Sequence, residues 1–104
     1  MPAKFLKQQL DFKPGVTNVV IINEFMLKFS LKSREYVVYM PMSSEYLVGS
    51  DVIAKAIDKG ADLVVCEPWC QVTGEAYTSA TNNGEVKVYP IGNFLSKITK
   101  SEDI

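Results

Sequence analysis

Four short segments rich in apolar and β-branched residues constrain the fold of this 104-residue chain more than any other feature. Prolines at positions 41 and 68 close two of them. Segments of this length and composition are typical of β-strands, whereas a membrane helix needs about 20 consecutive apolar residues. We therefore expect a sheet and no membrane-spanning segment. The four segments are residues 16–22, 36–40, 63–66 and 86–89.

Helical patterns lie around these strands. Residues 4–10 carry apolar side chains at helical spacing. A second helix, capped either by residues 43–45 or by residues 50–51, is expected to run to Lys59 with one apolar stripe, and Gly60 is suited to stop it. Residues 93–100 predict a closing helix. A helix followed closely by an apolar strand is typical of a crossover onto a parallel sheet. The predicted fold class is therefore α/β: one domain, 1–104, whose mixed or mostly parallel sheet of four to five strands is flanked by helices in three layers.

Four segments are less certain or atypical. Residues 24–34 alternate apolar and polar side chains, which favours a hairpin strand over a helix. Residues 74–83 suit either a helix or a strand, and we expect the helix. The strand at 16–22 is expected to be buried on both faces because it has few polar residues. Residues 101–104 are expected to be a frayed tail.

The composition excludes several kinds of catalytic site. The chain has no histidine, which rules out Ser-His-Asp and Cys-His nucleophilic systems and histidine-containing zinc sites within one chain. Two cysteines are too few for a four-sulfur zinc site; we expect Cys66 in the core and Cys70 as a reduced loop thiol. We therefore expect no cofactor, with Mg²⁺ held by carboxylates as the alternative.

The charge is nearly balanced but unevenly distributed. Eleven Lys and Arg oppose twelve Asp and Glu, yet the first 34 residues hold six basic and two acidic residues. The overall balance argues against tight nonspecific binding of nucleic acid, while the basic third leaves a local phosphate-facing surface open. No signal-peptide pattern is present, and we expect a cytoplasmic protein. The six basic residues are Lys4, Lys7, Lys13, Lys28, Lys32 and Arg34.

Asp62, Glu85 and Lys87 could together support hydrolysis. Glu85 and Lys87 would share one face of a strand, and carboxylates that hold Mg²⁺ beside a lysine can activate water for phosphodiester cleavage. An aspartate followed downstream by Glu-x-Lys resembles the signature of restriction-endonuclease-like nucleases, whose core order of helix, three strands, helix and strand also fits the expected elements. The resemblance implies a Mg²⁺-dependent nuclease. The simpler alternative is that Asp62 opens a strand and that Glu85 and Lys87 face solvent.

The loop at residues 67–75 is a candidate binding site. It follows a buried strand and contains the only tryptophan, Trp69, with Gln71, Thr73 and Glu75 near the expected start of a helix. Small ligands commonly bind at the carboxyl ends of parallel strands, and a helix N-terminus favours anions. The loop could therefore hold a small anionic ligand; alternatively, Trp69 covers the core or anchors a protein partner.

The leading functional prediction is a small non-enzymatic protein-interaction module that associates with a partner protein or with itself as a homodimer. It rests on the lack of a complete catalytic motif and on Trp69. Four aromatic residues of the expected hairpin are predicted to supply an apolar oligomer surface. The nuclease and the binder of a small anion are the alternatives. The four aromatic residues are Phe25, Phe29, Tyr36 and Tyr39.

Overall fold

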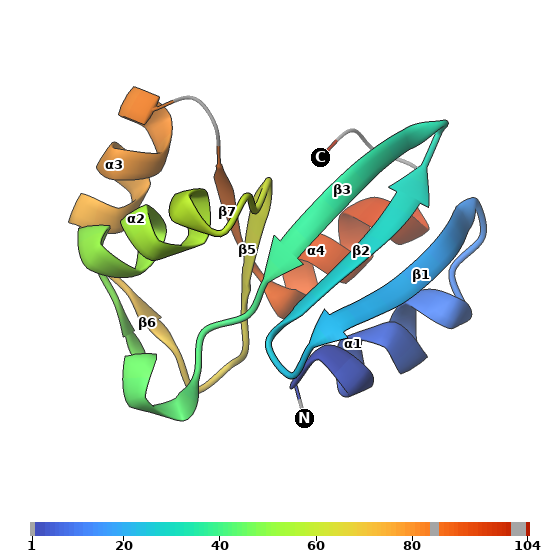
Figure 1. The fold of residues 1–104 in the computed structure, drawn as a ribbon, viewed down its shortest axis with the longest axis horizontal. Helices are drawn as coiled ribbons and strands as arrows, with labels where there is room; N and C mark the ends of the chain where they lie inside the picture. The colour runs from blue at the N-terminus through green and yellow to red at the C-terminus, as the bar shows by residue number, and fades with distance from the viewer. Residues whose placement is uncertain (1, 84–85, 101–103) are drawn as a thin grey trace.

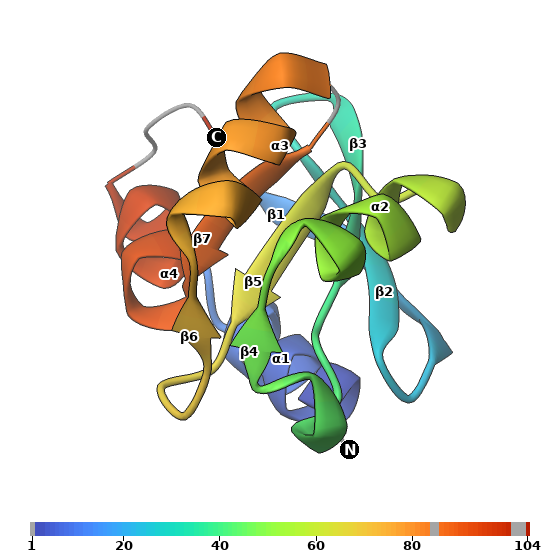
Figure 2. The same ribbon diagram turned by 90° about the vertical axis from the view of Figure 1, so that its left-hand side faces the viewer.

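The computed structural model describes residues 2–83, 86–100 and 104. Figures 1 and 2 show these residues from two perpendicular directions. The radius of gyration is 12.6 Å, close to the roughly 13 Å of a compact domain of about 100 residues. The chain is therefore one compact domain of mixed α and β structure. Within the described ranges no helix reaches the length and apolar character that crossing a membrane requires.

Helices and strands follow each other along the chain in an order close to the one expected. They are α1 (Pro2–Asp11), β1 (Val16–Asn23), β2 (Met26–Leu31), β3 (Arg34–Tyr39), the 3₁₀ turn η1 (Ser43–Glu45), β4 (Leu47–Val48), α2 (Ser50–Asp58), β5 (Leu63–Cys66), β6 (Gln71–Val72), α3 (Gly74–Asn83), β7 (Lys87–Pro90) and α4 (Ile91–Thr99).

The main sheet has the strand order β1-β2-β3-β5-β7. Strands β1, β2 and β3 pair antiparallel, whereas β3, β5 and β7 pair parallel, so the predicted mixed sheet of four to five strands is confirmed. The hairpin prediction for residues 24–34 is also confirmed. Lys32 and Ser33 make its turn with positive φ angles of 53° and 66°, which suit the right-handed twist of the strands. The helix predicted at 74–83 is α3.

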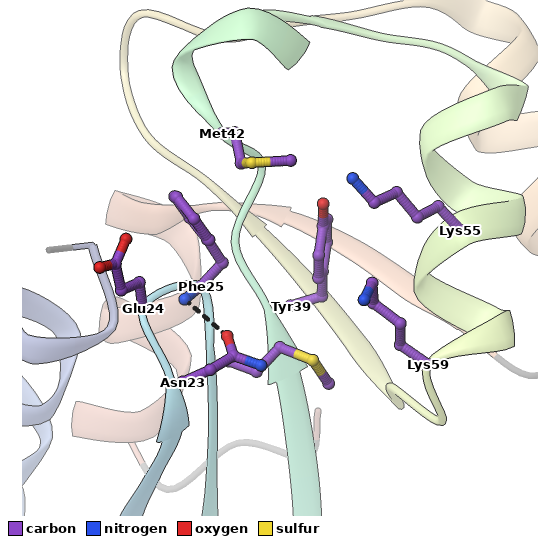
Figure 3. A pocket seen from close by; sticks show the side chains of 8 residues that line it. Asn23, Glu24, Phe25, Tyr39, Met42, Lys55 and Lys59 are labelled. Carbon is purple, nitrogen blue, oxygen red and sulfur yellow. Dashed lines mark hydrogen bonds between the residues drawn. The ribbon is translucent and has the colours of Figure 1, made fainter.

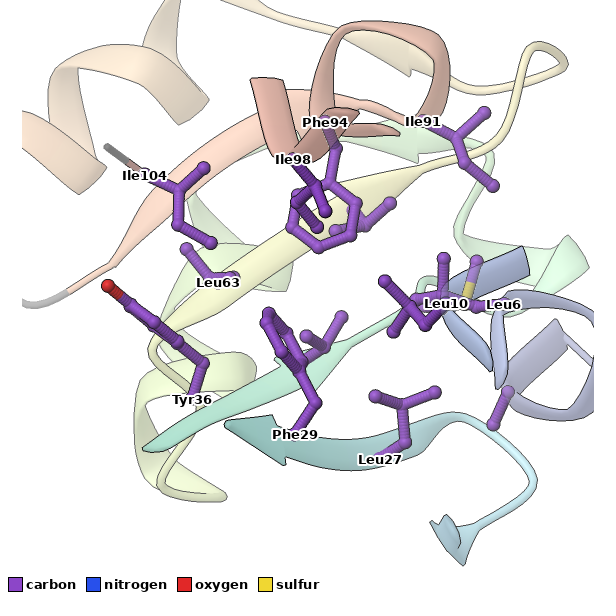
Figure 4. Close-up of a cluster of buried hydrophobic side chains, with 14 of the residues drawn as sticks. Leu6, Leu10, Leu27, Phe29, Tyr36, Leu63, Ile91, Phe94, Ile98 and Ile104 are labelled. Carbon is purple, nitrogen blue, oxygen red and sulfur yellow. The ribbon is translucent and has the colours of Figure 1, made fainter. Parts of the chain in front are cut away.

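The first of two buried clusters joins α1 and α4 to the sheet (Figure 4). Phe94 of α4 lies at its centre, fully buried, with its ring 6.0 Å from that of Phe29 and 6.3 Å from that of Tyr89. Leu6 and Leu10, one helical turn apart on α1, are also fully buried. An apolar stripe on each of these helices is thus what fixes it against the strands.

The second cluster joins α2 and α3 to the sheet. Val52, Ile53 and Ala56 of α2 are buried there, as the helical stripe predicts. Along β5, Leu63 and Val65 belong to the first cluster while Val64 and Cys66 belong to the second. This strand is buried on both faces because parallel pairing places it between β3 and β7.

Strand β1 was expected to be buried on both faces, and that expectation is wrong. It lies at the margin of the sheet and pairs with β2 (Figure 1). Val16, Val19 and Ile21 pack against the first cluster, but Val20 and Ile22 remain 47% and 49% exposed. An apolar strand looks the same in sequence at the centre and at the edge of a sheet, since only the strand order decides which it is.

The predicted aromatic oligomer surface is also wrong. Phe29, Tyr36 and Tyr39 are 0%, 8% and 2% exposed and belong to the two buried clusters, while Phe25 packs against the second one. These aromatic side chains therefore stabilise the interior. Of the predicted frayed tail, residues 101–103 lie outside the described residues, and Ile104 is buried in the first cluster.

Sequence patterns missed the short parallel pair β4 and β6. Leu47 pairs with Gln71 and Val48 with Val72, and the backbone N–H of Gln71 donates to the carbonyl of Tyr46 at 2.7 Å. A strand of two residues is too short to show an alternating pattern. The pair ties the loop after β5 to the segment between β3 and α2 (Figure 2).

Candidate functional site

Asp62 lies immediately before β5 and has a structural task. Its Oδ2 accepts a hydrogen bond from the backbone N–H of Val37 at 2.9 Å, and its own N–H donates to the carbonyl of Val37 at 2.8 Å. These two bonds add one more pair of residues, Val37 and Asp62, to the pairing between β3 and β5. The carboxylate thus satisfies a backbone donor that would otherwise lack a partner.

Lys87 opens β7 beside Leu63 of β5. Leu63 belongs to the first cluster, while Val64 and Val88, the next pair along, face the second. The backbone N–H of Lys87 donates to the carbonyl of Asp62 at 3.1 Å, so these two residues are neighbours at the start of β5 and β7, while the carboxylate of Asp62 is directed to β3. Glu85 lies outside the described residues. The nuclease site of Asp62, Glu85 and Lys87 therefore stays a prediction, and the part of the chain described holds no group of three acidic or cysteine side chains able to bind a metal.

The loop at 67–75 contains β6 and the start of α3. Trp69 is 42% exposed, and its indole Nε1–H donates to the carboxylate of Glu67. Gln71 and Glu75 are exposed. Thr73 begins α3, because its Oγ1 accepts a hydrogen bond from the N–H of Ala76 at 3.2 Å. Trp69 is thus held by its neighbour while much of its ring stays in solvent.

The two cysteines are free thiols. Burial raises the pKa of Cys66 to about 12, and burial also raises the pKa of Cys70. A thiol is nucleophilic only as the thiolate, so neither residue is prepared for catalysis at neutral pH.

Several members of the basic N-terminal third already have partners. Lys7 pairs with Asp11 at 3.0 Å, Lys28 lies 3.9 Å from Glu35, and Lys13 donates to the Oγ1 of Thr99. Arg34 lies over the ring of Tyr36, 5.1 Å from its centre. The basic residues of the predicted surface are therefore engaged in separate local contacts.

A pocket of about 280 Å³ opens at the end of β3, where the sheet changes from antiparallel to parallel pairing (Figure 3). The turn between β1 and β2 forms one side, and α2 forms the other. Its lining combines aromatic rings and sulfur atoms with two ammonium groups. The lining residues are Asn23, Glu24, Phe25, Met26, Tyr39, Met42, Lys55 and Lys59.

Hydrogen bonds fix the floor of this pocket. The phenol of Tyr39 donates to Oε1 of Glu45 at 2.6 Å, and the N–H of Met42 donates to the same oxygen at 2.9 Å. Lys55 binds Oε2 of Glu45 at 3.0 Å, and its ammonium lies 5.8 Å from the centre of the Tyr39 ring. Glu45 therefore holds a helix residue, a strand residue and the segment between them in one arrangement.

The ionisation of this network follows from its contacts. Burial, together with the hydrogen bond to Glu45, raises the pKa of Tyr39 to about 12. Burial opposes ionisation of Glu45, but the donors Tyr39, Met42 and Lys55 outweigh it and lower the pKa of this carboxyl. The hydrogen bond to Glu45 raises the pKa of Lys55. At neutral pH the network contains a neutral phenol, a carboxylate and an ammonium.

The opposite side of the pocket is held by the backbone. The N–H of Phe25 donates to Oδ1 of Asn23 at 2.9 Å, and the carbonyl of Phe25 accepts from the N–H of Met40 at 2.8 Å. Sequence reasoning missed this site. One signal was available, since Lys55 and Lys59 are four residues apart and therefore share a helix face.

Comparison of the chain with known protein families, with curated protein sequences and with solved structures gave no match.

Proposed function

We propose that this protein is a small interaction module that forms a homodimer through the outer edge of β1. The observation that carries the proposal is an eight-residue edge strand without a single charged side chain, on which Val20 and Ile22 are half exposed. Edge strands usually carry charges or proline because their free N–H and C=O groups invite pairing with another chain. An uncharged apolar edge suits a regular partner strand.

A second copy is the partner that fits this edge best. Two identical strands can pair antiparallel about a two-fold axis, which makes the contact self-complementary. With the axis at Ile21, Val20 of one copy lies opposite Ile22 of the other, and the same apolar pair occurs twice. The β1–β2 pairing is irregular between Thr17 and Val20, where Asn18 has a φ of 53°, and again between Ile21 and Asn23, so we assign the contact to the short segment around Ile21.

We also propose the three-layer arrangement that the sequence predicts, in which helices cover both sides of the sheet. The first cluster supports a layer of α1 and α4, and the second supports a layer of α2 and α3 on the other side. In this arrangement α2 and α3 lie over β3, β5 and β7. Val20 and Ile22 then belong to the part of the sheet that this second layer leaves open.

A second candidate surface lies around Trp69. Tyr46 and Leu47 are 54% and 51% exposed, and β4 and β6 hold them at the same end of the domain as Trp69. Tryptophan and tyrosine are enriched among the residues that contribute most to binding energy in protein interfaces. Gln71, Thr73 and Glu75 would belong to this surface as predicted.

Sedimentation velocity between 5 and 500 µM (roughly the range in which weak dimers dissociate) tests the proposal. We expect a concentration-dependent dimer whose dissociation constant rises at least tenfold in Val20→Lys, because the ammonium would face the apolar Ile22 of the other copy. Phe12→Ser is the matched control, since Phe12 is 87% exposed and lies outside β1. Trp69→Ala tests the second surface.

Each outcome either identifies the dimer interface or excludes one of the two candidate surfaces. Loss of the dimer in Val20→Lys but not in Trp69→Ala supports the β1 edge, and the reverse result moves the interface to Trp69. A monomer at every concentration refutes self-association. Circular dichroism of each variant checks that the fold is retained, which we expect because the substituted side chains are exposed.

A further inference from the structure

We propose that the pocket between the β1–β2 turn and α2 binds a small planar anion, a single aromatic ring that carries a carboxylate or a phosphate. This function goes beyond self-association, because the pocket lies at the end of β3 and includes neither Val20 nor Ile22. Its volume of about 280 Å³ is near the lower end of the roughly 300–1,000 Å³ of small-molecule sites. The pocket therefore favours one ring over a larger ligand.

The apolar part of the pocket suits a flat ring. Phe25 projects from the β1–β2 turn on one side, Tyr39 forms the floor, and Met42 lies above them (Figure 3). Aromatic faces and polarisable methionine side chains make favourable contacts with a planar group. Phe25 is partly exposed although it is a large aromatic residue, which leaves its ring accessible from the pocket.

The charged part of the pocket lies on α2. Lys55 and Lys59 both extend from this helix toward Tyr39, whereas Glu24 lies on the far side of Phe25 (Figure 3). The ammonium of Lys55 is neutralised by Glu45 at 3.0 Å. In the described part of the chain Lys59 has no ion pair, so its ammonium is the cation available to an incoming anion. The anionic group would thus lie at the α2 side, away from Glu24.

Hydrogen bonds within the protein hold the floor and the backbone of the lining. The phenol of Tyr39 is held by Glu45, the backbone of Phe25 is bonded to Asn23 and Met40, and the backbone N–H of Lys59, directly after α2, is bonded to the carbonyls of Lys55 and Ala56. A ligand therefore has to order only the side chains of Phe25 and Lys59. The phenol of Tyr39 already donates to Glu45, so its ring and not its hydroxyl is the contact surface.

Phenyl phosphate is the probe, with binding followed by ¹⁵N-resolved NMR shifts of the folded protein. Phenol supplies the ring without the charge, inorganic phosphate the charge without the ring, and benzylammonium the opposite charge. We expect phenyl phosphate to bind with a dissociation constant at or below about 1 mM and at least tenfold more tightly than any of the three. Benzoate distinguishes the carboxylate from the phosphate: the tighter of the two identifies the group.

Lys59→Met is the decisive variant, because Lys59 is exposed and its loss leaves the fold intact. We expect it to weaken phenyl phosphate about tenfold, as removal of one charge-assisted contact does. Lys4→Met, an equally exposed lysine on α1, is the matched control and should not change the affinity. Phe25→Leu should weaken binding of the ring several-fold while inorganic phosphate is unaffected.

Three results would overturn the proposal. They are the absence of shifts at the pocket with 10 mM phenyl phosphate (about ten times the expected dissociation constant), equal affinity of Lys59→Met and the wild type, and equal binding of benzylammonium. The Val20→Lys monomer should bind the probe as the wild type does, so failure of this proposal and failure of the dimer are separate results.

Discussion

Replacement of Tyr39 by phenylalanine should change how the stability of this protein depends on alkaline pH. Tyr39 is 2% exposed, and burial with the hydrogen bond to Glu45 raises its pKa from 10.0 to about 12. Because the folded state holds the phenol neutral more strongly than the unfolded state does, the stabilisation is fully present below pH 10. It is lost as the pH rises through 12.

The magnitude follows from the shift. A rise of two pKa units corresponds to about 2.7 kcal/mol of unfolding free energy. About 2 kcal/mol of this should disappear in the wild type between pH 10 and about 12, the interval between the unfolded and folded pKa values. Tyr39→Phe lacks the ionisable group and should not show this loss. At pH 7 the variant should be about 1.5–3 kcal/mol less stable, because a hydrogen bond to a carboxylate is removed.

Urea denaturation followed by far-ultraviolet circular dichroism, repeated at several pH values, measures both effects. Lys55 is present in both proteins, but its pKa is raised by Glu45 and also by Tyr39, so the difference between their curves reports Tyr39 together with its effect on Lys55. Parallel curves above pH 9.5 would show that the phenol ionises as in the unfolded chain. In that case the hydrogen bond to Glu45 does not control it, and the reasoning about the pocket floor fails.

Three further predictions concern the core, the strand junction and the thiols. Phe94→Ala should lower the unfolding free energy by about 3–5 kcal/mol in urea denaturation, since Phe94 is fully buried between other rings, whereas Phe12→Ala should change it by less than about 0.5 kcal/mol. Asp62→Ala should cost about 1–3 kcal/mol in the same assay because the N–H of Val37 loses its acceptor; a variant as stable as the wild type would show that this bond contributes nothing. Cys66 should react with a thiol reagent at pH 8 only as fast as the protein unfolds, because burial raises its pKa to about 12, and rapid labelling of the native protein would contradict this.

Much of the fold could be predicted because local signals were strong. The apolar stripe before Lys59 and the following Gly60, whose φ is 80°, predicted α2 and its end, and the run of Leu63–Cys66 predicted a strand of a parallel sheet. Alternation from Phe25 to Leu31 predicted the hairpin. Each of these patterns repeats within a few neighbouring residues. It can therefore be recognised without knowledge of any contact between residues far apart in the chain.

The candidate site could be predicted only in part. Trp69 was singled out from the sequence, the structure leaves it 42% exposed, and its role in binding stays a prediction. The pocket was missed because its lining comes from three separate segments: the β1–β2 turn, the end of β3 and α2. Nothing in the sequence links Phe25 to Lys59 until the strands are placed in order.

The sequence by itself determined most of the longer helices and strands, that residues 63–66 form a strand of a parallel sheet, and that histidine-dependent chemistry within one chain is excluded. Only the tertiary structure decided which strands lie at the edge of the sheet and which aromatic side chains are buried. It left Val20 and Ile22 on an open edge, buried Phe29, Tyr36 and Tyr39, and brought Lys55 to Glu45 beside Tyr39. The physical reason is that secondary structure depends on neighbours within one or two turns. Burial and pockets depend instead on strand order and on which helix covers which face, and these are set by contacts between residues far apart in the chain.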